Sequence, residues 1–206
     1  MEQEQSFSPQ LDRDVRLALL LGRYMDYWGI PSARQAFVRG EKERVEVYSF
    51  PAKSLEDAHR FASVGVSSLQ RYDGTALNEE LMTVLPPGLR GANEELVTGL
   101  LMELVAYSRM NNVSYRWGMT LVQGIRIPSC WSTTALLLDE PRFDPEELSF
   151  FQHGEQSIRM MCVYFIHQDE VEFIGQHGAA TFFERMKRSE WNLADPIRPS
   201  CLAPAT

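Results

Sequence analysis

The stretch that decides the fold is Ile158-Arg159-Met160-Met161-Cys162-Val163-Tyr164-Phe165-Ile166-His167. It is apolar almost without interruption between Met160 and Ile166. A short, continuous apolar run is typical of a strand that is buried inside a sheet, whereas a half-exposed strand alternates apolar and polar residues. We therefore expect residues 158–167 to form a central strand.

Other extended segments surround this strand in the sequence. They are Val45–Phe50, Arg60–Ser68, Glu80–Leu85, Gly118–Ile127 and Thr133–Asp139. Asp73-Gly74 is a favoured tight-turn dipeptide, so the second and third of these segments are predicted to form an antiparallel hairpin. The charge-dense stretch Arg39–Arg44 indicates a solvated turn in front of the first strand, Val45–Phe50.

Three helices are predicted from capping residues and apolar spacing. The first covers Pro9–Trp28, with Ser8 as its N-cap and proline at its first position. Its small or apolar residues at helical spacing are Leu11, Val15, Ala18, Leu19, Gly22 and Met25. The second helix follows Asn93, and its apolar face is formed by Leu96, Leu100, Leu101, Leu104 and Tyr107. The third begins at Gln168 or Asp169 and continues to Arg188.

The order of these elements predicts an α+β fold: a single-domain, mixed but mainly antiparallel sheet flanked by helices. We expect residues 1–40 to form an N-terminal helical segment that packs on a domain of residues 41–192. Three prolines follow Trp191, so residues 193–206 are predicted to form an extended tail that lies over the surface or frays.

Composition excludes several classes of partner. Twenty Lys and Arg residues stand against 28 Asp and Glu among 206 residues, and the net charge of −8 opposes binding to nucleic acid. No apolar run approaches the roughly 20 residues that span a bilayer.

The acidic start, Met1–Gln5, differs from a signal peptide, and three widely separated cysteines fit a reducing compartment. A cytoplasmic protein is the expectation.

The motifs of common catalytic and metal sites are missing. Leu136–Pro141 resembles an ATPase strand that ends in an acidic pair, but the chain has no phosphate-binding G-x-x-x-x-G-K-[ST] loop. His59, His153, His167 and His177 lack the spacing of metal ligands. We predict no cofactor, no metal and no enzymatic activity. A hydrolase whose carboxylates come together only in the folded chain is left open as an alternative.

An acidic stretch with interspersed aromatic residues is the candidate partner-binding site. Its proposed contact residues are Asp139, Glu140, Phe143, Asp144, Glu146 and Glu147. The carboxylates would steer a basic protein towards the surface, and the aromatic rings would supply buried area. The alternative is a solvated loop and short helix whose phenylalanines face the core. It is the more common arrangement, because runs of charged residues are usually just exposed.

Several segments together resemble the suppressor-of-fused-like domain family over Val45–Trp191. Ser63-Val64-Gly65-Val66-Ser67 resembles the family's glycine-serine strand, and Glu80–Pro86 resembles its E-L-x-x-x-L-P run. These are followed, in the order of the family, by an apolar helix and by further short matches. The matches are Trp117–Thr120, Ile127-Pro128, an apolar strand ending at Asp139, and Glu170–Gly178.

The resemblance implies a mixed sheet flanked by helices and a role in binding another protein, and it brings no catalytic residues. Eukaryotic members of the family sequester a transcription factor, whereas stand-alone bacterial members are similar to immunity proteins that neutralise toxins. The chain is similar to the bacterial type, so the expected partner is a cognate secreted toxin. A scaffold or regulator that sequesters an endogenous protein is the alternative.

Overall fold

The computed structural model describes residues 9–39, 43–89, 94–189 and 191–202. The helices are α1 (Pro9–Trp28), α2 (Glu94–Asn111), α3 (Gln168–His177) and α4 (Ala179–Lys187), with the short 3₁₀ helices η1 (Val66–Ser68) and η2 (Glu146–Leu148). The strands are β1 (Ala33–Arg39), β2 (Glu43–Phe50), β3 (His59–Val64), β4 (Glu79–Leu85), β5 (Met119–Leu121), β6 (Ala135–Asp139), β7 (Phe150–His153) and β8 (Gln156–Ile166).

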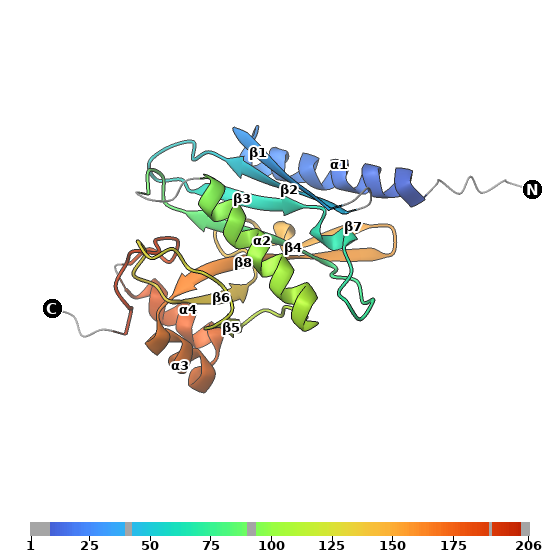
Figure 1. The fold of residues 1–206 in the computed structure, drawn as a ribbon. Helices are drawn as coiled ribbons and strands as arrows, with labels where there is room; N and C mark the ends of the chain where they lie inside the picture. Colours follow the sequence, from blue (N-terminus) through green and yellow to red (C-terminus); the bar gives the residue numbers. More distant parts are fainter. Residues whose placement is uncertain (1–8, 40–42, 90–93, 190, 203–206) are drawn as a thin grey trace, which may run out of the picture.

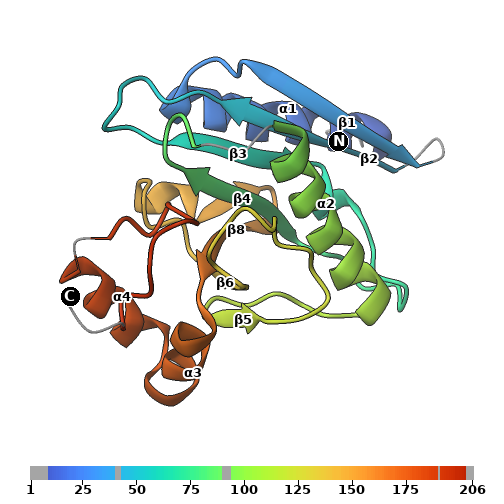
Figure 2. The ribbon, with the colours of Figure 1, turned by 60° about the vertical axis from the view of Figure 1, so that its left-hand side comes forward.

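The strands form one eight-stranded sheet in the order β1-β2-β3-β4-β8-β6-β5, with β7 paired to the first part of β8. All pairs are antiparallel except β4 with β8. Helix α2 covers one face of the sheet, and α1, α3 and α4 cover the other (Figures 1 and 2). The predicted α+β fold, with a mixed and mainly antiparallel sheet, is confirmed.

Strand β8 is the central strand that its sequence predicts. It pairs with β4 on one side and with β6 on the other. Its even-numbered residues from Met160 to Ile166 join the core beneath α1, α3 and α4, while Met161, Val163 and Phe165 join the core beneath α2. Both faces of the strand are therefore apolar, which explains why the run is continuous rather than alternating.

A buried carboxylate links the predicted hairpin of β3 and β4. Glu80, on β4, is fully buried, and it accepts hydrogen bonds from the amides of Gly65, Val66 and Ser67 at 3.0–3.2 Å. The hydroxyls of Ser63 and Ser67 donate two more at 2.6 and 2.7 Å. Five donors compensate for the loss of hydration of this charge, so the turn after β3 is held against β4.

Two strands lie outside the predicted set. Strand β1 precedes Val45–Phe50, so that segment is not the first strand. Of the predicted turn Arg39–Arg44, the residues Arg39, Glu43 and Arg44 belong to strands, and residues 40–42 lie outside the described residues. Alternate β1 residues are exposed on this edge strand, and charged side chains mask its apolar pattern. Strand β7 was likewise not predicted.

Two segments that were predicted as single long elements are shorter or divided in the structure. Of Gly118–Ile127, only Met119–Leu121 is a strand, since the chain departs from an extended conformation at Gly124, whose φ is +90°. The predicted helix from Gln168 to Arg188 is two helices, because Gly178, with φ +82°, interrupts it. Ser8 and Asn93, the predicted capping residues, lie outside the described residues.

The C-terminal segment is integrated into the domain over its described part. Arg198 is 2% exposed and makes hydrogen bonds of 2.6 and 2.7 Å to the carboxylate of Glu170, at the start of α3. The amide of Cys201 donates to the same carboxylate at 2.9 Å. A buried ion pair therefore ties these residues to α3.

Helix α1 packs on the sheet with a face other than the small and apolar repeat noted in its sequence. Leu20, Tyr24 and Trp28 are the buried anchors, with exposures of 0–4%. By contrast Val15 and Leu19, which belong to the predicted apolar repeat, are 44% and 52% exposed. The helix therefore has an inner apolar face and an outer apolar stripe.

The Gly65 turn gives a test of this architecture. A β-carbon at Gly65, where φ is +111°, would lie 2.6 Å from the carbonyl oxygen of Arg44, whereas one at Gly74, where φ is +86°, would meet nothing within 4 Å. Both Gly→Ala changes carry a backbone penalty, but only Gly65→Ala adds a clash. We expect Gly65→Ala to reduce the free energy of unfolding by about 1–3 kcal/mol more than Gly74→Ala in urea titrations. Equal losses would contradict the close approach.

Candidate protein-binding groove

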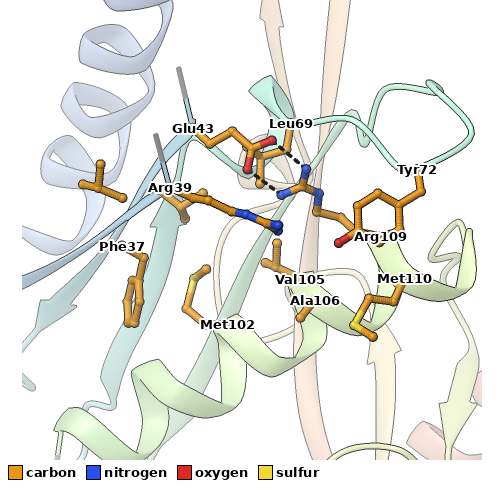
Figure 3. A pocket seen from close by; sticks show the side chains of 12 residues that line it. Phe37, Arg39, Glu43, Leu69, Tyr72, Met102, Val105, Ala106, Arg109 and Met110 are labelled. Atoms are coloured by element: carbon orange, nitrogen blue, oxygen red, sulfur yellow. Dashed lines mark hydrogen bonds and ion pairs between the residues drawn. The ribbon is translucent and has the colours of Figure 1, made fainter. Parts of the chain in front are cut away.

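An apolar groove lies between the end of the β1–β2 hairpin and the C-terminal half of α2 (Figure 3). Its volume is about 190 Å³. It is lined by Phe37, Val38, Arg39, Glu43, Val45, Leu69, Tyr72, Met102, Val105, Ala106, Arg109 and Met110. Pockets for small molecules generally measure about 300–1,000 Å³, so this groove is better suited to side chains of a protein.

Regular secondary structure places the lining residues. On α2, positions 102, 105, 106, 109 and 110 follow helical spacing and therefore share one face. In the hairpin, Phe37 pairs with Val45 and Arg39 pairs with Glu43. Alternation along both strands directs these four side chains to the face that α2 covers.

An ion pair closes one side of the groove. Arg109 donates to both carboxylate oxygens of Glu43, at 2.7 and 2.9 Å, and to the carbonyl oxygen of Gln70 at 2.8 Å. Its guanidinium carbon lies 5.8 Å from the centre of the Tyr72 ring. The hydrogen bond from Arg109 lowers the pKa of Glu43, and the same bond raises the pKa of Arg109. The hairpin, the loop after η1 and α2 are thus joined at one point.

The rim of the groove exposes residue types that are common in protein interfaces. Met110 is 66% exposed and Tyr72 is 61% exposed. Val38 is also 66% exposed, but its side chain lies on the opposite face of β1 from Phe37 and Arg39. Arg39 projects into the groove (Figure 3) and forms no ion pair with any residue that the structure describes. Aromatic, methionine and arginine side chains are enriched at interfaces, and large exposed apolar side chains that gather at one place mark a contact surface.

The structure separates the six residues of the predicted acidic site into two groups. The carboxylate of Asp144 is 3% exposed and binds Arg60 at 2.8 Å and the indole nitrogen of Trp28 at 2.9 Å. Asp139 is also buried, and Arg142 bonds to it at 3.0 Å and to Glu140 at 2.9 Å. These carboxylates form ion pairs within the domain. The Asp139–Arg142 pair could have been recognised in the sequence, because the two residues are three positions apart.

The other members of that site lie at the surface. They are Phe143, Glu146 and Glu147. Glu146 and Glu147 start η2, and Arg23 of α1 donates to the carbonyl oxygen of Glu147, so this part of the segment lies beside α1. The phenylalanines of the region are divided, because Phe151 is buried whereas Phe143 and Phe150 are 39% and 48% exposed.

One serine–histidine contact resembles part of a hydrolase site. The hydroxyl of Ser49 lies 2.6 Å from Nε2 of His59 and 2.9 Å from a carboxylate oxygen of Glu94. In a catalytic triad the acid contacts the histidine, whereas here it contacts the serine. Ser49 is 2% exposed, and these three residues line neither the groove nor a second pocket between α1 and β2. Burial lowers the pKa of His59.

Metal-ligand clusters and membrane-spanning helices are both missing from the described ranges. No group of three or more His, Cys, Asp or Glu side chains in these ranges is arranged to hold a metal ion. None of the helices in the described ranges combines the length and hydropathy needed to cross a membrane.

The fold and the groove define an α+β domain with a surface suited to a protein. Residues 41–199 match the model of the suppressor of fused protein (SUFU) family, and the chain belongs to this family. No curated protein matches the sequence.

Solved structures share the fold at low sequence identity. A SUFU homologue from Neisseria gonorrhoeae is similar with a TM-score of 0.70 and 16% identity, over 95% of this chain and 100% of the other. A structure of a Sufu–Fu complex gives 0.65 and 11%, over 92% of each chain. Drosophila Suppressor of Fused gives 0.65 and 12%, over 95% of this chain and 54% of the other.

The Glu43–Arg109 pair gives a pH-dependent prediction. Because folding lowers the pKa of Glu43, the stabilisation is present above the ordinary glutamate pKa and is lost as pH falls through the lowered value. We expect Glu43→Gln to reduce the free energy of unfolding by about 0.5–1 kcal/mol at pH 7, because the pair is partly solvated. The difference should shrink towards pH 3 in urea titrations. Glu56→Gln, on an exposed loop, is the matched control, and a Glu43→Gln deficit that is constant with pH would contradict this role.

Proposed function

We propose that this chain is a non-enzymatic protein-binding domain that neutralises a cognate bacterial toxin by direct contact, as an immunity protein does. The observation that carries the proposal is the groove, whose exposed rim residues Tyr72 and Met110 border an apolar floor. A protein partner could bury these side chains with little rearrangement, because the Glu43–Arg109 pair already fixes the walls.

Size and charge support this form of the proposal. The chain aligns with the whole of the Neisseria gonorrhoeae homologue, which makes a stand-alone domain a reasonable functional unit. Its net charge of −8 would speed encounter with a basic toxin, for example a nuclease. The exposed acidic residues Glu146 and Glu147 would contribute to that steering, with Phe143 beside them. A cytoplasmic location would follow from the need to meet the toxin inside the cell.

A second candidate function is that of a scaffold or regulator that sequesters an endogenous protein. The similarity to a Sufu protein in complex with Fu favours it, since that relative binds a protein partner. The two candidates differ in the identity of the partner. A neighbouring reading frame that encodes a secreted protein with a variable C-terminal toxic domain would support neutralisation, and a partner taken from the cell's own proteins would support regulation.

Affinity measurements with that C-terminal toxic domain test the proposal. We expect the double variant Tyr72→Ala/Met110→Glu to weaken binding at least about 100-fold, because central contact residues contribute about 2 kcal/mol or more each. Tyr72 is 61% and Met110 is 66% exposed, so the fold should tolerate the changes. The matched control is Leu55→Glu, at a residue that is 90% exposed outside the groove.

The same variants should differ in how well they protect cells from the toxic domain. Wild type and Leu55→Glu should protect cells that express the toxic domain, and the groove variant should not. Full protection and unchanged affinity in the groove variant would show that the groove is not the binding surface. If the wild type does not bind the toxic domain at all, the toxin is not the partner.

A further inference from the structure

Helix α1 carries an apolar stripe on the side that faces away from the sheet. Its exposed apolar members are Leu11 (46%), Val15 (44%), Leu19 (52%) and Met25 (37%), with Ala18 also exposed and Gly22 between them. Positions 11, 15, 18, 22 and 25 follow spacings of four, three, four and three residues, which is the seam of a coiled coil. The small residues in the middle, Ala18 and Gly22, would let a second helix approach closely.

The inner side of α1 is fixed to the domain, so the stripe is presented permanently. Tyr24 and Trp28 stack with ring centres 4.8 Å apart, and Trp28 also packs against Phe50 of β2. Arg16 is buried and donates to the Ser68 hydroxyl at 2.9 Å and to the Gln156 side chain. Rotating the helix to bury the stripe would break these contacts.

Charges around the stripe select the kind of partner. Asp14 and Asp26 are exposed and flank the seam on opposite sides. Asp12 is close to one flank and lies 3.2 Å from Nε2 of His153. The three arginines of α1 are directed elsewhere, because Arg13, Arg16 and Arg23 donate to Arg44, to Ser68 and Gln156, and to Glu147. A second copy of this chain would place aspartate opposite aspartate, whereas a helix flanked by Lys or Arg would meet complementary charge.

We propose that the outer stripe of α1 binds an amphipathic helix of a partner protein whose apolar seam is flanked by basic residues. This surface is distinct from the groove, since α1 and α2 lie on opposite faces of the sheet (Figure 2). The acidic residues Glu146 and Glu147 lie beside α1 and would add to its attraction for a basic helix.

The test uses synthetic three-heptad helical peptides and the full chain. One peptide has Leu at its seam positions and Lys at its flanking positions, and the second has the same seam with Glu flanks. Fluorescence anisotropy should show binding of the Lys peptide and at least tenfold weaker binding of the Glu peptide. The double variant Val15→Gln/Met25→Gln should bind the Lys peptide at least tenfold more weakly than wild type, while Leu55→Gln, at an exposed apolar residue outside the stripe, should bind it like wild type.

Three results would overturn the proposal. They are no binding of the Lys peptide, equal binding of the two peptides, and equal binding by wild type and the Val15→Gln/Met25→Gln variant. A wild-type dimer in sedimentation analysis that this variant abolishes would also overturn it, in favour of a second copy as the occupant. Circular dichroism checks that the variant keeps its helices. None of these outcomes bears on toxin binding at the groove, which is measured with a different ligand and different variants.

Discussion

The carboxylate of Glu80 is the group on which the rest of the structure depends. It is a buried charge whose five hydrogen bonds come from Ser63 in β3 and from the turn after β3, and none of these donors is a cation. Strand β4 pairs with β3 on one side and with the central strand β8 on the other. Fixing the turn on β4 therefore also holds strands β1 to β3 against the central strand. The same turn brings Gly65 against the backbone of Arg44, next to Glu43 at the start of β2 and at the edge of the groove. A single constraint in the core therefore positions the surface that we propose to be functional.

Much of the fold could be predicted because its strongest signals are local. The uninterrupted apolar run of β8 and the Asp73-Gly74 turn each specify their own geometry. The edge strand β1 gave no such signal, since it is covered on one face only and carries exposed charges. Helix α1 was located correctly, but its sequence has two apolar faces, and only tertiary contacts decide which of them is buried.

The groove could not be predicted, since its residues come from three separate segments and none carries a motif. The acidic segment offered a visible pattern instead, but Asp144 is held by Arg60, a residue 84 positions away, and no spacing rule reveals that pair. The family resemblance succeeded for a physical reason. In this chain the Ser63–Ser67 segment and the Glu80–Pro86 segment, which carry the resemblance, are the two halves of the Glu80 interaction and make one buried contact.

The groove between the β1–β2 hairpin and α2 is the surface that we propose to bind the toxin. Hydrogen–deuterium exchange of the chain, alone and bound to its cognate toxic domain, tests it most directly because amide exchange reports protection along the whole chain. The account predicts slower exchange on binding in peptides that cover the groove segments 37–45, 69–72 and 102–110. Protection confined to other segments, with unchanged exchange in these three, would contradict it.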